Sequence, residues 1–89
     1  MTECRYQRSS AAVWRASASF LVAAVPPRRP TRISGSASVV WALFAVPRTV
    51  NEVVEELAAL VDTAPEQLHT DVDALIAQLL PLQLVQVVV

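Results

Sequence analysis

The chain has 89 residues, of which 54% are hydrophobic and 17% are charged, and its formal net charge is −1. This composition is typical of one small folded domain and excludes a disordered tail. The single glycine excludes a glycine-rich phosphate loop, and no apolar run reaches the roughly 18 residues that a membrane helix needs.

The charged residues are divided between the two halves of the sequence. All seven basic residues are arginines that lie before Thr49, whereas the stretch from Thr49 onward holds seven acids and no base. Glu3 is the one acid of the first half. This division is compatible with a solvated surface at each end, or with a partner that carries both signs of charge.

The N-terminal residues predict little regular structure. We expect residues 1–11 to form a flexible arm and residues 12–89 to form one domain. The stretch RASASFLVAAVPP has the apolar centre of a secretory signal, but its uninterrupted apolar part, residues 20–25, is short. Cys4 is the only cysteine. It cannot form an intramolecular disulfide, which favours a cytoplasmic location.

Three short strands are expected next. Residues 12–16 and 19–25 contain β-branched and aromatic residues separated by small ones, which is the pattern of a hairpin. The segment PPRRP at 26–30 cannot continue a central strand and predicts a stiff, charged turn. The third strand, residues 31–33, is short and lies beside charge and proline, which is typical of the edge of a sheet.

A first helix is predicted within the stretch SGSASVVWALFAV. Ser36 is positioned to cap its start. Pro47 ends it, because a proline pushes the preceding residue out of the helical region. The apolar side chains recur at helical spacing, on one face that comprises Ala37, Val40, Trp41 and Phe44.

Two further helices are predicted, each with a capping box at its start. Thr49 pairs with Glu52 in the first box and Thr63 with Glu66 in the second. The apolar stripe of the second helix comprises Val50, Val53, Val54, Leu57 and Val61. The stripe of the third comprises Leu68, Val72, Leu75, Ile76 and Leu79, before Pro81. The β-branched residues 82–88 predict a terminal strand or wing.

No catalytic or metal-binding constellation is evident in the sequence. The single histidine, His69, lies off the apolar face of its helix, and no third residue accompanies His69 and Cys4. Asp71 and Asp73 point in different directions on a helix, and the ligand spacing of a metal site is missing. We therefore expect no enzyme activity, no metal and no cofactor.

Two kinds of binding function remain. A helix-turn-helix with a strand suggests a winged helix, and hence a DNA-binding transcriptional regulator. Affinity for DNA comes largely from Lys and Arg. The seven acids on the helices that would dock therefore argue against a nucleic acid partner. A short edge strand beside a helix instead fits a peptide that adds as a further strand.

An ordered set of motifs carries a resemblance to a known family. ISGSA occupies residues 33–37 and precedes Trp41, PRTVNE occupies 47–52, and DVDALIAQL occupies 71–79. Over residues 12–86 the chain resembles the PqqD-like family, also called the RiPP recognition element, of pyrroloquinoline quinone synthesis and related pathways. The resemblance implies an α+β, winged helix-turn-helix-like fold, with a three-stranded antiparallel sheet followed by three helices.

The resemblance also implies a function without chemistry. Members capture the leader of a ribosomally made precursor peptide as an added strand and present it to a modifying enzyme, such as a radical-SAM enzyme, a cyclase or a protease. Carried over, the leader lies between the third strand and the third helix. The expected contacts are Arg29, Thr31, Arg32, Ile33, Gln67, Asp71, Ala74, Leu75 and Gln78.

Within that set, Ile33 is expected in the core, Asp71 beside a base of the leader, and Arg29 or Arg32 beside acids. No membrane partner is expected, and the free strand edges leave both a monomer and a homodimer open. The chain departs from the family at Gln83, where members often have glycine. Because a left-handed conformation costs glutamine more than glycine, the third helix is expected to close differently.

Overall fold

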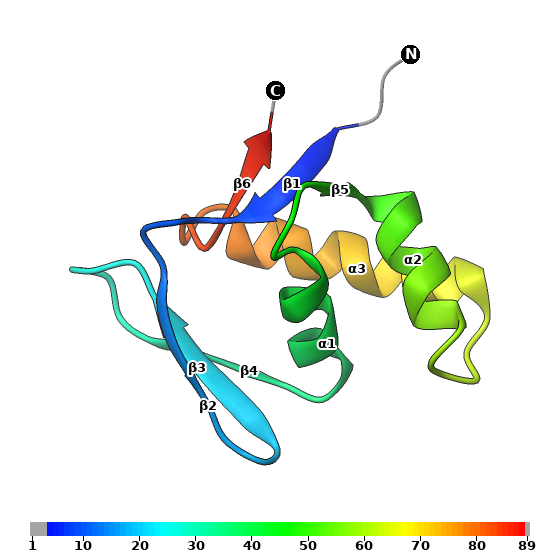
Figure 1. Ribbon diagram of the computed structural model, residues 1–89, viewed down its shortest axis with the longest axis horizontal. Coiled ribbons are helices and arrows are strands. Elements are labelled where there is room, and N and C mark those ends of the chain that lie inside the picture. The colour runs from blue at the N-terminus through cyan, green and yellow to red at the C-terminus, as the bar shows by residue number, and fades with distance from the viewer. Residues whose placement is uncertain (1–3, 89) are drawn as a thin grey trace.

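The computed structural model describes residues 4–88, which form an α+β fold with three helices and six strands (Figure 1). The strands make two antiparallel sheets, with the orders β2-β3-β4 and β5-β1-β6. The elements are β1 (Arg5–Arg8), β2 (Val13–Ala16), β3 (Phe20–Ala24), β4 (Thr31–Ser34), α1 (Ser36–Leu43), β5 (Arg48–Thr49), α2 (Val50–Ala58), α3 (Pro65–Leu79) and β6 (Val85–Val88).

The antiparallel sheet β2-β3-β4, which we call the hairpin sheet, confirms the three strands that the sequence predicts at 12–16, 19–25 and 31–33. The expectation of one sheet was wrong, because β1, β5 and β6 form a second sheet. The terminal strand predicted within residues 82–88 is present as β6. What holds from the predicted architecture is therefore an α+β fold with antiparallel strands and three helices.

Strand β1 lies where the sequence suggested a loose arm. Arg5 to Arg8 pair with Val88 to Val85 of β6, and Arg5 also faces Thr49 of β5. The short polar sequence RYQR carries no local strand pattern, so this strand forms only because two distant segments offer it partners. Residues 1–3 of the expected arm lie outside the described residues.

The side chain of Arg8 connects β1 to the hairpin sheet. Its guanidinium carbon lies 5.0 Å from the ring centre of Trp14 and 5.5 Å from that of Trp41. The two tryptophan rings meet edge to face, with their centres 6.3 Å apart. A cation over an aromatic face is attracted by the ring quadrupole, so Arg8 stabilises the junction between the two sheets.

The core has two clusters, and α1 and α3 contribute to both. The first joins the three helices and comprises Val40, Phe44, Val53, Val54, Leu57, Leu68, Val72 and Ile76. The second joins the hairpin sheet to the ends of α1 and α3 and comprises Leu21, Ala23, Ile33, Trp41, Leu79, Leu84 and Val85. The helical stripes that the sequence predicts supply most of these side chains.

Helix α1 begins differently from its prediction. Ser36 is the first helical residue, and Gly35 precedes it as the N-cap with φ 63° and ψ −142°. No side chain caps the start, so the predicted Ser36 cap was wrong. The hydroxyl of Ser38 instead donates to the carbonyl of Gly35 over 2.7 Å. The positive φ explains the glycine, since other residues adopt that region at a cost.

Helix α2 begins with the predicted capping box. The N–H of Glu52 donates to the Thr49 hydroxyl over 3.1 Å, and the Thr49 N–H donates to the Glu52 carboxylate over 2.9 Å. The bond from the Thr49 backbone is the main reason why the pKa of Glu52 is lowered. Both bonds depend on residues three positions apart, which explains why the sequence alone predicts them.

The capping box predicted for α3 is wrong. Ala64, not Thr63, is the N-cap, and Pro65 is the first helical residue. Proline suits the first helical position because its fixed φ is already helical and its missing N–H would be unpaired there. It also holds the preceding residue in an extended conformation, and Ala64 has ψ 137°.

The expectation that Gln83 changes how α3 closes was wrong, because Gln83 adopts the left-handed conformation itself. This residue has φ 60°. Its N–H donates to the carbonyl of Leu80 over 2.9 Å, and the N–H of Leu84 donates to that of Leu79 over 3.2 Å. These two bonds are those of a Schellman motif, in which a left-handed residue ends the helix. Leu79 and Leu84 belong to the same buried cluster, as the motif's apolar contact requires.

Candidate functional site

Strand β4 forms one edge of the hairpin sheet, with β3 on one side and no described strand on the other. The orientation of its backbone follows from the turn between β2 and β3. There the N–H of Ser17 donates to the carbonyl of Phe20 over 2.8 Å. Hydrogen-bonding groups alternate between the two sides of an antiparallel strand. The backbone of Phe20 therefore faces β2, and the backbones of Leu21 and Ala23 face β4.

On β4, Ile33 and Thr31 lie opposite the two β3 residues whose backbones face this strand. Ile33 and Thr31 therefore direct their N–H and C=O groups toward β3. By the same alternation, Arg32 and Ser34 direct theirs away from β3 and toward the open edge. The structure thus leaves two residues of β4 with backbone groups available to another strand.

The side chains of β4 divide between the two faces of the sheet. Ile33 is 3% exposed and packs in the core, as expected. Thr31 shares this face by alternation and is half-buried. Arg32 is on the other face, and its guanidinium carbon lies 4.2 Å from the ring centre of Phe20. The backbone of Arg32 is therefore directed to the open edge, while its side chain lies over the outer face of the sheet.

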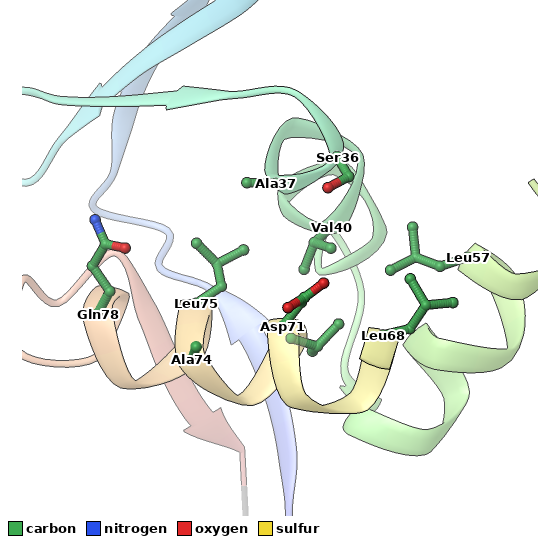
Figure 2. A pocket seen from close by; sticks show the side chains of 10 residues that line it. Ser36, Ala37, Val40, Leu57, Leu68, Asp71, Ala74, Leu75 and Gln78 are labelled. Carbon is green, nitrogen blue, oxygen red and sulfur yellow. The ribbon is translucent and has the colours of Figure 1, made fainter. Parts of the chain in front are cut away.

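A pocket of about 260 Å³ lies between α3 and the start of α1. Figure 2 shows Asp71, Leu75 and Gln78 directed from α3 toward the side on which β4 leads into α1. The lining is mostly apolar, and Asp71 is the only ionisable residue among the described residues that line it. The lining residues are Ser36, Ala37, Val40, Leu57, Leu68, Asp71, Val72, Ala74, Leu75 and Gln78.

The carboxylate of Asp71 has one side-chain partner on its own helix. The amide Nε2 of Gln67 donates to its Oδ1 over 2.9 Å. The ion pairs between described residues are Arg48–Glu56 at 3.6 Å and His69–Asp73 at 3.0 Å, so neither Asp71 nor Arg32 takes part in one. The negative charge of Asp71 is therefore oriented at the pocket but not neutralised there.

The residues predicted to bind a peptide fall into two groups. Asp71, Ala74, Leu75 and Gln78 line the pocket, and Gln67 supports Asp71 from outside it. The other group comes from β4 and the loop before it: Thr31, Arg32 and Ile33 lie on the strand, and Arg29 is exposed in the loop.

The sequence did not predict the contribution of α1 to the pocket. Ser36, Ala37 and Val40 form its wall opposite α3. Ala37 and Val40 were expected only in the core, since they belong to the apolar face of their helix. The small side chain of Ala37 was a signal that this face leaves space where it meets α3.

A second pocket, of about 310 Å³, brings together residues that are distant in the sequence. Cys4, Tyr6, Val50, Asn51, His69 and Asp73 line it. The imidazole Nδ1 of His69 lies 3.0 Å from the carboxylate of Asp73. Asp73 is thus the partner of His69, and Cys4 lines the same pocket. All three residues are exposed to solvent.

Residues 4–88 offer neither a metal-binding cluster nor a membrane-spanning helix. No group of three or more His, Cys, Asp and Glu residues in this part of the chain is arranged to hold a metal ion. None of its helices is long and apolar enough to cross a membrane.

The chain was compared with known proteins. The sequence profile of the family described as coenzyme PQQ synthesis protein D (PqqD) matches residues 23–85. Neither the curated proteins nor the solved structures gave a significant match. The matched region includes β4, all three helices and the whole lining of the pocket between α1 and α3. It spans well over half of the sequence, and the chain therefore belongs to the PqqD family.

Proposed function

We propose that this chain is a non-catalytic domain that binds the leader of a ribosomally made precursor peptide and presents it to a modifying enzyme. Membership of the PqqD family supports a peptide-binding role in the synthesis of PQQ or of a related peptide-derived product. The leader adds to β4 as a further strand. The observation that carries this proposal is the open backbone of Arg32 and Ser34 at a sheet edge.

Backbone pairing supplies affinity without regard to sequence, and the pocket supplies selectivity. Alternate side chains of an added strand point to the face of the sheet that Ile33 occupies, and so toward α3. A pocket of about 260 Å³ with Val40, Leu68 and Leu75 in its lining suits an aliphatic side chain. Burial of one such side chain contributes about 1.5–3 kcal/mol, which is enough to distinguish leaders that carry it from those that do not.

Asp71 adds a requirement for charge. Its carboxylate lines the pocket and has an amide, not a cation, as its partner. A Lys or Arg of the leader at this position gains an ion pair, whereas an Asp or Glu is repelled. The acids of α3 are thus unfavourable for a nucleic acid and favourable for a peptide that carries a base.

The modifying enzyme supplies the chemistry in this proposal. The domain holds the leader while the enzyme, such as a radical-SAM enzyme, a cyclase or a protease, acts on the remainder of the precursor. Cys4, His69 and Asp73 line a different pocket from Asp71. In this proposal the leader therefore does not contact these three residues.

The substitution Arg32→Pro tests strand addition. Proline removes the N–H that faces the open edge, and the bonds to β3 remain because Thr31 and Ile33 make them. Arg32→Gln is the matched control, since it also loses the guanidinium but keeps the N–H. Candidate leaders are the N-terminal parts of short peptides encoded beside the gene, and calorimetry measures their binding.

Arg32→Pro is expected to abolish leader binding and Arg32→Gln to retain most of it, with native circular dichroism in both. Equal binding by the two variants would show that the leader does not pair with β4.

A further inference from the structure

Opposite charges lie at the two ends of the open edge of β4. Arg28 and Arg29 precede the strand and are exposed, and Arg32 lies within it. At the other end, β4 is followed by Gly35 and by α1, whose first residue lines the pocket together with Asp71. A peptide along this edge therefore passes from a basic region to an acidic one.

The direction of the peptide follows from the sheet. The hairpin sheet is antiparallel throughout, and antiparallel pairs are slightly more stable per residue than parallel ones. A peptide added to β4 in this way has its N-terminal side near α1 and Asp71. Its C-terminal side lies near Arg32 and Arg29.

The alternation of side chains along a strand then determines how far apart the charged and aliphatic residues of the peptide must be. A peptide residue directly opposite Arg32 projects its side chain on the face that Arg32 occupies, where directly opposite charges attract. The preceding peptide residue is opposite Ile33 and projects toward α3 and the pocket. The residue two positions before that one shares its face and lies just beyond the end of β4, next to the start of α1, where Ser36 lines the pocket together with Asp71.

From this register we propose that the leader carries a charge-ordered motif: a Lys or Arg, any residue, an aliphatic residue, and an Asp or Glu, in the direction from N- to C-terminus. This inference rests on the proposed function and specifies the peptide that it takes. The base pairs with Asp71, the aliphatic side chain enters the pocket, and the acid pairs with Arg32. A leader with the base and the acid exchanged would bring its acid to Asp71 and its base to Arg32, and both pairs would repel.

Neither Arg32 nor Asp71 forms an ion pair with another residue among residues 4–88. Among residues 4–88, the interaction of Arg32 is with the Phe20 ring and that of Asp71 is with the Gln67 amide. Both side chains are exposed. Each charge is thus available to a peptide without first breaking an ion pair of the protein.

A displayed library of random decapeptides tests the motif. It is selected on the wild-type protein and on the double variant Arg32→Glu with Asp71→Arg, in which the two charges are exchanged. Arg15→Glu is the matched control, because Arg15 lies on the same outer face but on β2, at the other edge of the sheet. Selected sequences are then synthesised, each with a partner peptide in which its base and acid are exchanged.

Selection on the wild type and on the Arg15→Glu control is expected to enrich peptides with a base three positions before an acid. Selection on the double variant is expected to enrich peptides with an acid three positions before a base. A synthetic peptide is expected to bind the wild type about tenfold more tightly than its charge-exchanged partner, because two attractive pairs become repulsive. Added salt should reduce this ratio.

The other outcomes separate the motif from the proposed function. Peptides that lose binding with Arg32→Pro but show no charge order, or the opposite order, would overturn the motif and leave strand addition in place. If no peptides are enriched, or if the enriched peptides bind Arg32→Pro as well as the wild type, both the motif and the proposed strand addition are overturned.

Discussion

The amide of Gln67 donates a hydrogen bond to the carboxylate of Asp71, one helical turn further along α3, over 2.9 Å. Residues four apart are neighbours on a helix surface, so this bond restricts the rotation of the Asp71 side chain while leaving its charge in place. The carboxylate lies in the lining of the pocket between α3 and α1.

Reversal of this charge is expected to weaken leader binding. Asp71→Arg should cost about 1–2 kcal/mol, the order for a partly desolvated charge contact at an interface, and calorimetry at low and moderate salt measures the loss. Asp73→Arg is the matched control, since Asp73 is also an exposed acid of α3 but does not line this pocket. Equal effects of the two substitutions would mean that net charge alone is responsible.

The capping box at the start of α2 makes stability depend on pH. The Thr49 N–H holds the pKa of Glu52 below its usual value. Folding therefore favours the ionised carboxylate, whose contribution is present above the unfolded pKa and is lost as the pH falls through the folded pKa. In urea titrations over the acidic range, Glu52→Gln should be less stable than the wild type near neutral pH, and the difference should shrink on acidification.

Glutamine can still accept the bond from Thr49, so this comparison isolates the charge of residue 52. A difference in unfolding free energy that stays constant across the acidic range would contradict a contribution from ionised Glu52. Glu55→Gln, on an exposed position of the same helix, is the control for the loss of one charge.

The end of α3 offers a stabilising substitution. Gln83 adopts φ 60°, a region that costs most residues roughly 1–2 kcal/mol and glycine almost nothing. After allowance for the greater freedom of glycine in the unfolded chain, Gln83→Gly should raise the unfolding free energy by about 0.5–1 kcal/mol. Denaturant titration measures it, and Gln86→Gly, within β6, should lower stability instead.

The N-terminal strand should be required for full stability. Tyr6 packs against both core clusters, and its ring meets that of Phe44 edge to face, with the centres 6.3 Å apart. Tyr6→Ala should lower the unfolding free energy by about 2 kcal/mol, less than for a fully buried aromatic residue. Arg5→Ala, on an exposed position of the same strand, should change it little. A Tyr6→Ala protein as stable as the wild type would contradict a contribution of the Tyr6 side chain to the core.

The features that the sequence predicted correctly are those that neighbouring residues determine. The capping box of Thr49 and Glu52 involves two residues three positions apart, and the apolar stripe of α3 repeats every three or four positions. Strand β1 could not be predicted in this way, because RYQR is short and polar and its partners are β5 and β6. The Thr63 box failed because Pro65 determined where α3 begins.

The candidate site shows the same division. Asp71, Ala74 and Gln78 could be predicted to lie together because they flank the apolar stripe of a single helix, and all three line the pocket. The wall formed by Ser36 and Ala37 comes from the packing of α1 against α3, which no local pattern encodes. The orientation of the β4 backbone required the register of the whole hairpin sheet.

The pairing of Arg5 with Val88 joins residues at opposite ends of the sequence. A contact between such distant residues requires closure of a loop that contains nearly the whole chain, and the entropy of closure increases with loop length. The sheet β5-β1-β6 therefore cannot be completed during synthesis until β6 has left the ribosome. The hairpin sheet and the three helices precede β6 in the sequence, so a nascent chain has the elements of the candidate site before it has the strand that completes its second sheet.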